Sequence, residues 1–129
     1  MAPAPPVDTY CLFERPGTER SRHIDALLAR LPPGEPVSLI IEGSAADGSE
    51  FALHRDRQAH VIAAGCPCCL GNLTMRVTLA RVLQQENPRH LVLALIDAGH
   101  AERVHAWLTA PPYASRLALR ALPGAAPSP

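Results

Sequence analysis

The stretch PVSLIIE at residues 36–42, together with HLVLALID at residues 90–97, decides the fold class. Each is a nearly continuous apolar run, which is typical of a strand covered on both faces. Shorter β-type runs at residues 9–14 (TYCLFE), 58–64 (QAHVIAA) and 116–122 predict three further strands. The chain therefore contains the strands of a buried sheet.

Helical patterns lie between these strands. Ser21 is a candidate N-cap for a helix whose apolar residues recur at helical spacing until the Pro-Pro-Gly of residues 32–34 stops it. Residues 70–85 form the longest periodic segment, and residues 101–108 predict a shorter helix. The side chains expected to face the core are Ile24, Leu27, Leu28 and Leu31 in the first helix and Val104, Trp107 and Leu108 in the last. The apolar positions of the segment 70–85 include Leu73, Val77 and Leu83. Strands alternating with helices predict an α/β fold with three layers, a mostly parallel sheet flanked by helices.

The length of 129 residues fits one domain, and only 4% of the residues are aromatic, so aliphatic side chains must fill the core. Residues 1–8 and 122–129 are rich in proline and alanine and have little to pack, so we expect disordered tails around a single domain at residues 9–121.

Charge and hydropathy exclude two classes of partner. The formal net charge is zero, lysine is absent and the arginines are scattered, which argues against nucleic-acid binding. The N-terminus lacks the features of a secretory signal, and we find no apolar run of membrane-spanning length. We expect a cytoplasmic protein, and the abundance of Ala, Pro and Arg suggests a bacterial source.

Three cysteines fall within four residues in the segment Gly65-Cys66-Pro67-Cys68-Cys69. Thiolates gathered in one short turn suit a soft or borderline ion such as Zn²⁺ or Cu⁺, and the helix that follows favours the thiolate form. Cys66 and Cys69 also have the Cys-x-x-Cys spacing of disulfide oxidoreductases. Metal binding is the preferred interpretation, with thiol redox chemistry and inert packing as the alternatives.

Three thiols are one ligand short of a closed tetrahedral zinc site, so a fourth ligand must come from elsewhere or from water. The candidates are Glu42, His54, His60 and His100. The remaining cysteine, Cys11, lies within the first predicted strand and is most simply a small core residue.

The segment GCPCC at residues 65–69, followed by LGNL, resembles the signature of the CobW-type metal-chaperone GTPases. The resemblance extends in order from about Thr9 to Leu119. It implies a fold like that of a P-loop GTPase domain, and a cysteine turn that handles zinc, cobalt or a related metal. It also implies that Glu42 matches the acidic position that the family places near its metal turn.

The nucleotide-binding motifs of that family are degenerate here. Its phosphate loop reads Gly-x-x-x-x-Gly-Lys-[Ser/Thr], whereas residues 14–21 read ERPGTERS. Only Ser21 fits, because Glu14 and Glu19 replace the glycines and Arg20 replaces the lysine. A carboxylate about 4 Å from a phosphate charge repels it by about 4 kcal/mol at an effective dielectric near 20.

Three later features of the family are also missing from this sequence. Its Glu-[Ser/Thr]-[Ser/Thr]-Gly segment is replaced by IDAG at residues 96–99, and we find neither its guanine-reading segment nor its C-terminal domain. We therefore expect a degenerate, truncated relative with no catalytic and no nucleotide-binding residues.

The sequence thus predicts a non-catalytic metal-binding protein of metal homeostasis, or a metallochaperone accessory. Zinc is the expected metal and Cys66, Cys68, Cys69 and Glu42 the expected ligands. The first alternative is a scaffold that pairs with a full-length GTPase of the family. The others are a thiol redox protein and a residual GTPase.

Overall fold

The computed structural model of the chain describes residues 5–43, 57–62, 70–96, 99 and 101–122. Strands and helices alternate along it as the sequence predicts. Their bounds are β1 Val7–Phe13, α1 Thr18–Arg30, β2 Val37–Glu42, β3 Arg57–Ile62, α3 Leu70–Arg81 with a π-helical turn η2 Val82–Glu86, β4 His90–Leu95, α4 Ala101–Leu108 and β5 Leu117–Leu119.

The five strands form one sheet in the order β3-β2-β4-β1-β5, and every pair in it is parallel. From β1 the chain passes through α1 to β2, on one side of β1, whereas from β4 it passes through α4 to β5, on the other side. The direction of progress along the sheet therefore reverses between β1 and β4. In open α/β sheets the crevice at such a reversal, outside the carboxyl ends of the strands, is where ligands bind.

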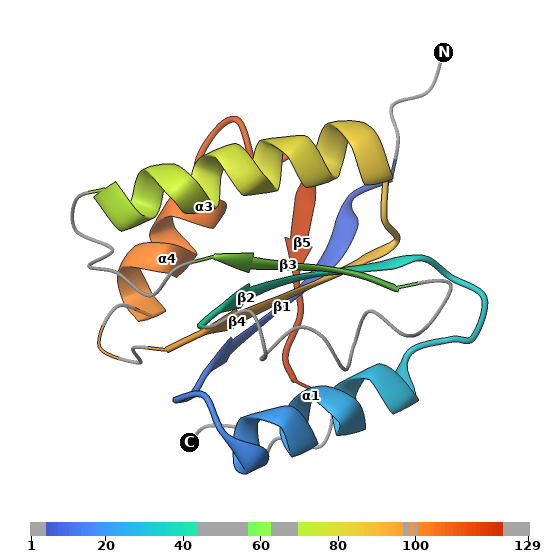
Figure 1. The fold of residues 1–129 in the computed structure, drawn as a ribbon. Helices are drawn as coiled ribbons and strands as arrows, with labels where there is room; N and C mark the ends of the chain where they lie inside the picture. Colours follow the sequence, from blue (N-terminus) through green and yellow to red (C-terminus); the bar gives the residue numbers. More distant parts are fainter. Residues whose placement is uncertain (1–4, 44–56, 63–69, 97–98, 100, 123–129) are drawn as a thin grey trace.

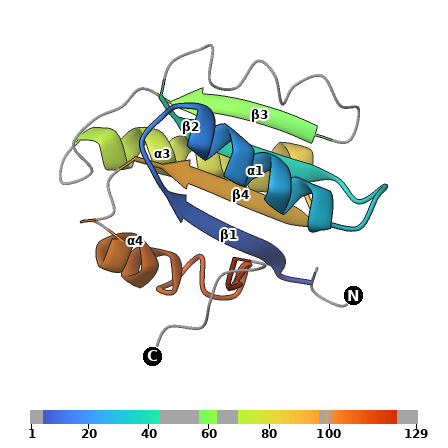
Figure 2. The ribbon, with the colours of Figure 1, turned by 90° about the horizontal axis from the view of Figure 1, so that it is seen from below.

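Helices cover both faces of the sheet, as Figures 1 and 2 show, so the predicted three-layer α/β architecture is confirmed. On one face, α1 packs its buried residues Ile24, Leu27 and Leu28 against alternate residues of β1, β2 and β4. On the other face, α3, η2 and α4 cover the remaining strand residues. Of the residues that the sequence assigned to α4's inner face, Leu108 is fully buried, and Val104 and Trp107 pack against this second core.

Two element starts differ from the sequence prediction. β1 begins at Val7, where the backbone pairs with β5, so Val7 and Asp8 belong to the sheet and not to a tail. α1 begins at Thr18, and its N-cap is Gly17 at a φ of 152°, a backbone angle that favours glycine. Ser21 is therefore inside the helix, and its N–H donates to the carbonyl of Gly17.

The helix α3 is apolar on two sides. Of the apolar residues in the predicted periodic segment, Leu83 is buried in η2, whereas Leu73 and Val77 have 58% and 51% of their surface exposed. The helix buries Met75 and Leu79 on its other side, and the core continues into η2. Periodicity alone does not show which of the two sides faces the core.

Candidate metal centre

The cysteine turn lies between two described elements. β3 ends at Ile62 and α3 begins at Leu70, while Cys66, Cys68 and Cys69 lie outside the described residues, as do His54 and His100. Because β3 is parallel to its neighbours, its carboxyl end shares a sheet edge with the ends of β2 and β4. The chain thus leaves the sheet toward the turn at the edge where ligands of this architecture bind.

Glu42 is the predicted ligand that the structure describes. It is the last residue of β2 and pairs in register with Ile62, and the N–H of Gly43 continues the pairing by donating to the Ile62 carbonyl at 2.9 Å. The Glu42 carboxylate oxygen Oε1 accepts a hydrogen bond from the backbone N–H of Ile96 at 2.9 Å. The carboxylate is therefore held at the carboxyl edge, beside the strand from which the chain enters the cysteine turn.

His60, a candidate fourth ligand, has a different set of partners. Its Nε2 contacts the Oε2 of Glu86, and the other oxygen of that carboxylate accepts a hydrogen bond from the Ser38 hydroxyl at 2.6 Å. The π-helical turn that ends at Glu86 brings this carboxylate over β2 and β3. This polar cluster was not predicted from the sequence. Its one sequence signal is Ser38, a serine inside the apolar run at residues 36–42.

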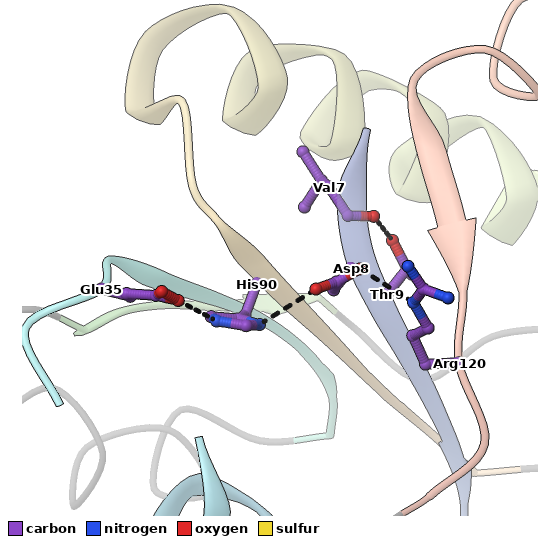
Figure 3. Close-up of polar contacts among 6 residues, drawn as sticks. All are labelled: Val7, Asp8, Thr9, Glu35, His90 and Arg120. Atoms are coloured by element: carbon purple, nitrogen blue, oxygen red, sulfur yellow. Dashed lines mark hydrogen bonds and ion pairs between the residues drawn. The ribbon is translucent and has the colours of Figure 1, made fainter. Parts of the chain in front are cut away.

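A second polar cluster surrounds the buried His90 at the opposite, amino-terminal edge of the sheet (Figure 3). Its Nε2 lies 3.0 Å from Glu35 Oε1, and its Nδ1 lies 3.9 Å from Asp8 Oδ2. Asp8 also pairs with the Arg120 Nε at 2.9 Å. The two carboxylates approach different ring nitrogens, so they do not converge on one ion. The cluster ties together β1, β4 and the segments before β2 and after β5.

The reversal between β1 and β4, where a phosphate loop would lie, is occupied by protein groups. The N–H of Glu14 donates to the Leu95 carbonyl at 2.8 Å, which extends the pairing of the two strands. Arg20, at the position of the family's lysine, is only 2% exposed, and its Nη1 donates to the Glu42 carbonyl at 2.7 Å. The Arg20 side chain is therefore buried and joins the start of α1 to the end of β2.

The two glutamates expected to repel phosphate behave differently from each other. Glu14 contacts the His23 Nδ1 of α1 at 2.6 Å, so its carboxylate stays beside the first turns of the helix. Glu19 is largely exposed and pairs with Arg22 at 3.4 Å. Glu14 thus lies against α1 and Glu19 is exposed, so the two carboxylates have different partners, and their expected repulsion of a phosphate stays a prediction.

The described residues hold no group of three or more His, Cys, Asp or Glu side chains that could bind a metal. Cys11 packs against the core on the α3 side, and burial raises the pKa of its thiol to about 11. That thiol is protonated at neutral pH and is a poor metal ligand. The prediction that Cys11 is a core residue agrees with this position. A metal centre with three such ligands therefore needs at least one from outside the described residues, and the cysteine turn is the candidate that the sequence offers.

The chain is an α/β protein with a five-stranded parallel sheet, and its architecture is consistent with a P-loop GTPase-like domain. It is 33% identical over 107 residues to the zinc chaperone YeiR of Escherichia coli (strain K12). That match covers 81% of this chain and 33% of YeiR, so the chain spans about a third of its relative's length. No protein-family model and no solved structure matches the chain. Among the described residues, no helix is long and apolar enough to span a membrane.

Proposed function

We propose that this chain is a non-catalytic zinc-binding protein, which acts in metal homeostasis or as an accessory to a metallochaperone. The observation that carries the proposal is the combination of a complete cysteine turn with an inward-directed Arg20. The similarity to a zinc chaperone supports zinc as the cargo, and the resemblance of residues 65–69 to the CobW-type signature supports the cysteines as its ligands.

Chain connectivity supports Glu42 as a member of this centre. Cys66 follows Ile62 by four residues, which span at most about 14 Å when extended. Ile62 is the register partner of Glu42, and neighbouring strands lie about 4.8 Å apart. The carboxylate is thus within reach of the thiolates, either as a ligand or as the acceptor that orients one. At the other end of the turn, Cys69 directly precedes α3, whose positive end stabilises thiolates.

The position of Arg20 supports the loss of nucleotide binding. A P-loop lysine donates to phosphate oxygens, whereas the Arg20 guanidinium already donates to the Glu42 carbonyl from a buried position. Releasing it would leave a buried charge without this hydrogen bond, which costs about 1.5–3 kcal/mol. The binding of a nucleotide would have to compensate for that free energy. It would also have to break the hydrogen bond from the Glu14 N–H to the Leu95 carbonyl of β4.

Zinc binding is tested by metal analysis after purification under reducing conditions and loading with Zn²⁺. We expect close to one equivalent of zinc, and its loss in Cys68→Ser. Cys11→Ser is the matched control, because it removes a thiol that lies in β1, outside the cysteine turn, and the protein should retain the metal. Less than about half an equivalent in the unmodified protein, or full retention in Cys68→Ser, contradicts the proposal.

Nucleotide binding is tested separately by isothermal titration with GTP and ATP in the presence of Mg²⁺. We expect no saturable binding of either nucleotide. A micromolar dissociation constant for either nucleotide would contradict the non-catalytic assignment without affecting the zinc result.

A further inference from the structure

The exposed face of α3 is the strongest unexplained feature of the described surface. Leu73 and Val77 are the two exposed large hydrophobic side chains among the described residues. They are four positions apart on one helix, so their side chains are neighbours on the same face. Isolated apolar side chains on a surface are ordinary, but a pair that shares one helix face forms a continuous patch.

The exposed face of α1, the other long helix, differs in composition from that of α3. The exposed positions of α1 are alanines and polar residues such as Arg22, Asp25 and Arg30. α3, in contrast, buries Met75 and Leu79 on its inner side and exposes Leu73 and Val77 on its outer side. A helix that is apolar on both sides is typical of one that is covered on both sides. Figure 1 shows α3 lying across one face of the sheet with α4 beside it.

The charged side chains of α3 itself all have one sign. Arg76 and Arg81 are both exposed and flank the Leu73–Val77 stripe on its two sides at helical spacing. α3 contains no aspartate or glutamate. The Cζ of Arg76 lies 5.2 Å from the ring centroid of Trp107 in α4, which holds this guanidinium at the edge of the patch. The face therefore combines an apolar centre with a cationic rim.

We propose that this face of α3, formed by Leu73, Arg76, Val77 and Arg81, binds an amphipathic helix of a partner protein whose apolar stripe is flanked by carboxylates. Apolar anchors in a helix-binding surface provide affinity, and charges at the rim select the complementary sign. The charge pattern disfavours a second copy of this face, since two arginine rims would oppose each other. The proposal goes beyond zinc binding and does not depend on it.

The test uses two synthetic helical peptides, each 18 residues long, with the same leucine stripe and with either glutamate or lysine on both flanks. Binding is measured by isothermal titration and by the fluorescence of Trp107, the single tryptophan. We expect micromolar binding of the glutamate peptide, and binding of the lysine peptide that is weaker by about tenfold or more, which corresponds to about 1.4 kcal/mol.

The double variant L73Q/V77Q should weaken binding of the glutamate peptide by about tenfold or more, because it removes the apolar centre. The matched control is A26Q/A29Q, which places two glutamines on exposed positions of α1, on the opposite face of the sheet. Both variants should retain the circular dichroism of the unmodified protein, since all four positions are on the surface or near it.

Three results would overturn the proposal. The first is no saturable binding of the glutamate peptide, and the second is equal binding of the two peptides. The third is a dimer in sedimentation experiments that L73Q/V77Q converts to monomer, because this would assign the face to a second copy. Failure of zinc loading would leave these measurements unchanged, so the two proposals fail separately.

Discussion

The Nη1 of Arg20 lies 2.7 Å from the carbonyl oxygen of Glu42, so the first turn of α1 is tied to the carboxyl end of β2. The side chain of Glu42 in turn accepts the N–H of Ile96, which follows β4. Arg20 and Glu42 thus connect three elements at the carboxyl edge of the sheet. These two hydrogen bonds connect α1, β2 and the residue after β4 at this edge.

Arg20→Met should therefore destabilise the fold although it retains most of the aliphatic stem. We expect a loss of about 1.5–3 kcal/mol in the free energy of unfolding, because a buried charge-assisted hydrogen bond is removed. Urea unfolding followed by circular dichroism measures it. Arg22→Met is the control, since Arg22 is exposed and its pair with Glu19 is worth less than about 1 kcal/mol. Equal effects of the two changes would show that the Arg20 contact is not structural.

The buried Cys11 thiol should make stability depend on pH at alkaline values. Burial raises its pKa to about 11, above the value of about 8.5 in an unfolded chain. Between these values the unfolded state loses the proton first, so this stabilisation is intact below about pH 8.5 and is lost by about pH 11. The slope approaches about 1.4 kcal/mol per pH unit.

Comparison with Cys11→Ala isolates this contribution. Burial, and secondarily the charge of Asp8, raises the pKa of Tyr10 as well, but that residue is common to both proteins. Unfolding free energies at pH 8.5 and 10.5 should fall more steeply for the unmodified protein, by about 2 kcal/mol. Parallel losses in the two proteins would mean that Cys11 ionises equally in the folded and unfolded states.

The fold was predictable because its strongest signals are local. The short apolar runs at residues 36–42 and 90–97, bounded by proline and glycine, favour strands buried on both faces, and they contain β2 and β4. The start of α1 was mispredicted because Gly17 supplies the N-cap by backbone angle, whereas the sequence offered a serine three residues into the helix. The side of α3 that faces the core could not be predicted, because its apolar residues fall on two sides.

The candidate site was predictable only in its residue types. Glu42 could be placed at a strand end from the sequence, but its contact with Ile96 joins residues 54 positions apart. The inward direction of Arg20 was also hidden, because a motif comparison shows which residue is replaced and not where its side chain points. Long-range polar contacts of this kind depend on the register of the sheet, which local sequence patterns do not specify.

The contacts among Ser38, His60 and Glu86 should stabilise the fold, because they join η2 to β2 and β3. Glu86→Ala removes the acceptor of a buried serine hydroxyl and of His60 together, so we expect a loss of about 2–3 kcal/mol in the free energy of unfolding. Glu86→Gln keeps one acceptor oxygen and should lose less. Gln85→Ala changes an exposed neighbour in the same turn and should cost less than about 0.5 kcal/mol. Chemical unfolding of all three variants decides this point.

Glu42→Gln separates the structural role of Glu42 from its proposed metal role. The glutamine carbonyl can still accept the N–H of Ile96, so the free energy of unfolding in the absence of metal should change by less than about 1 kcal/mol. Because we propose that this carboxylate belongs to the metal centre, its loss should lower zinc affinity by about 10–100-fold, the range for residues that bind or orient metal ligands. Competition with a chromophoric chelator measures that affinity, and Glu19→Gln, an exposed change of the same chemistry, should leave it unaltered. If Glu42→Gln binds zinc as tightly as the unmodified protein, Glu42 is not a zinc ligand and its carboxylate only connects β2 to the residue after β4. The fourth ligand of the zinc must then be a different group.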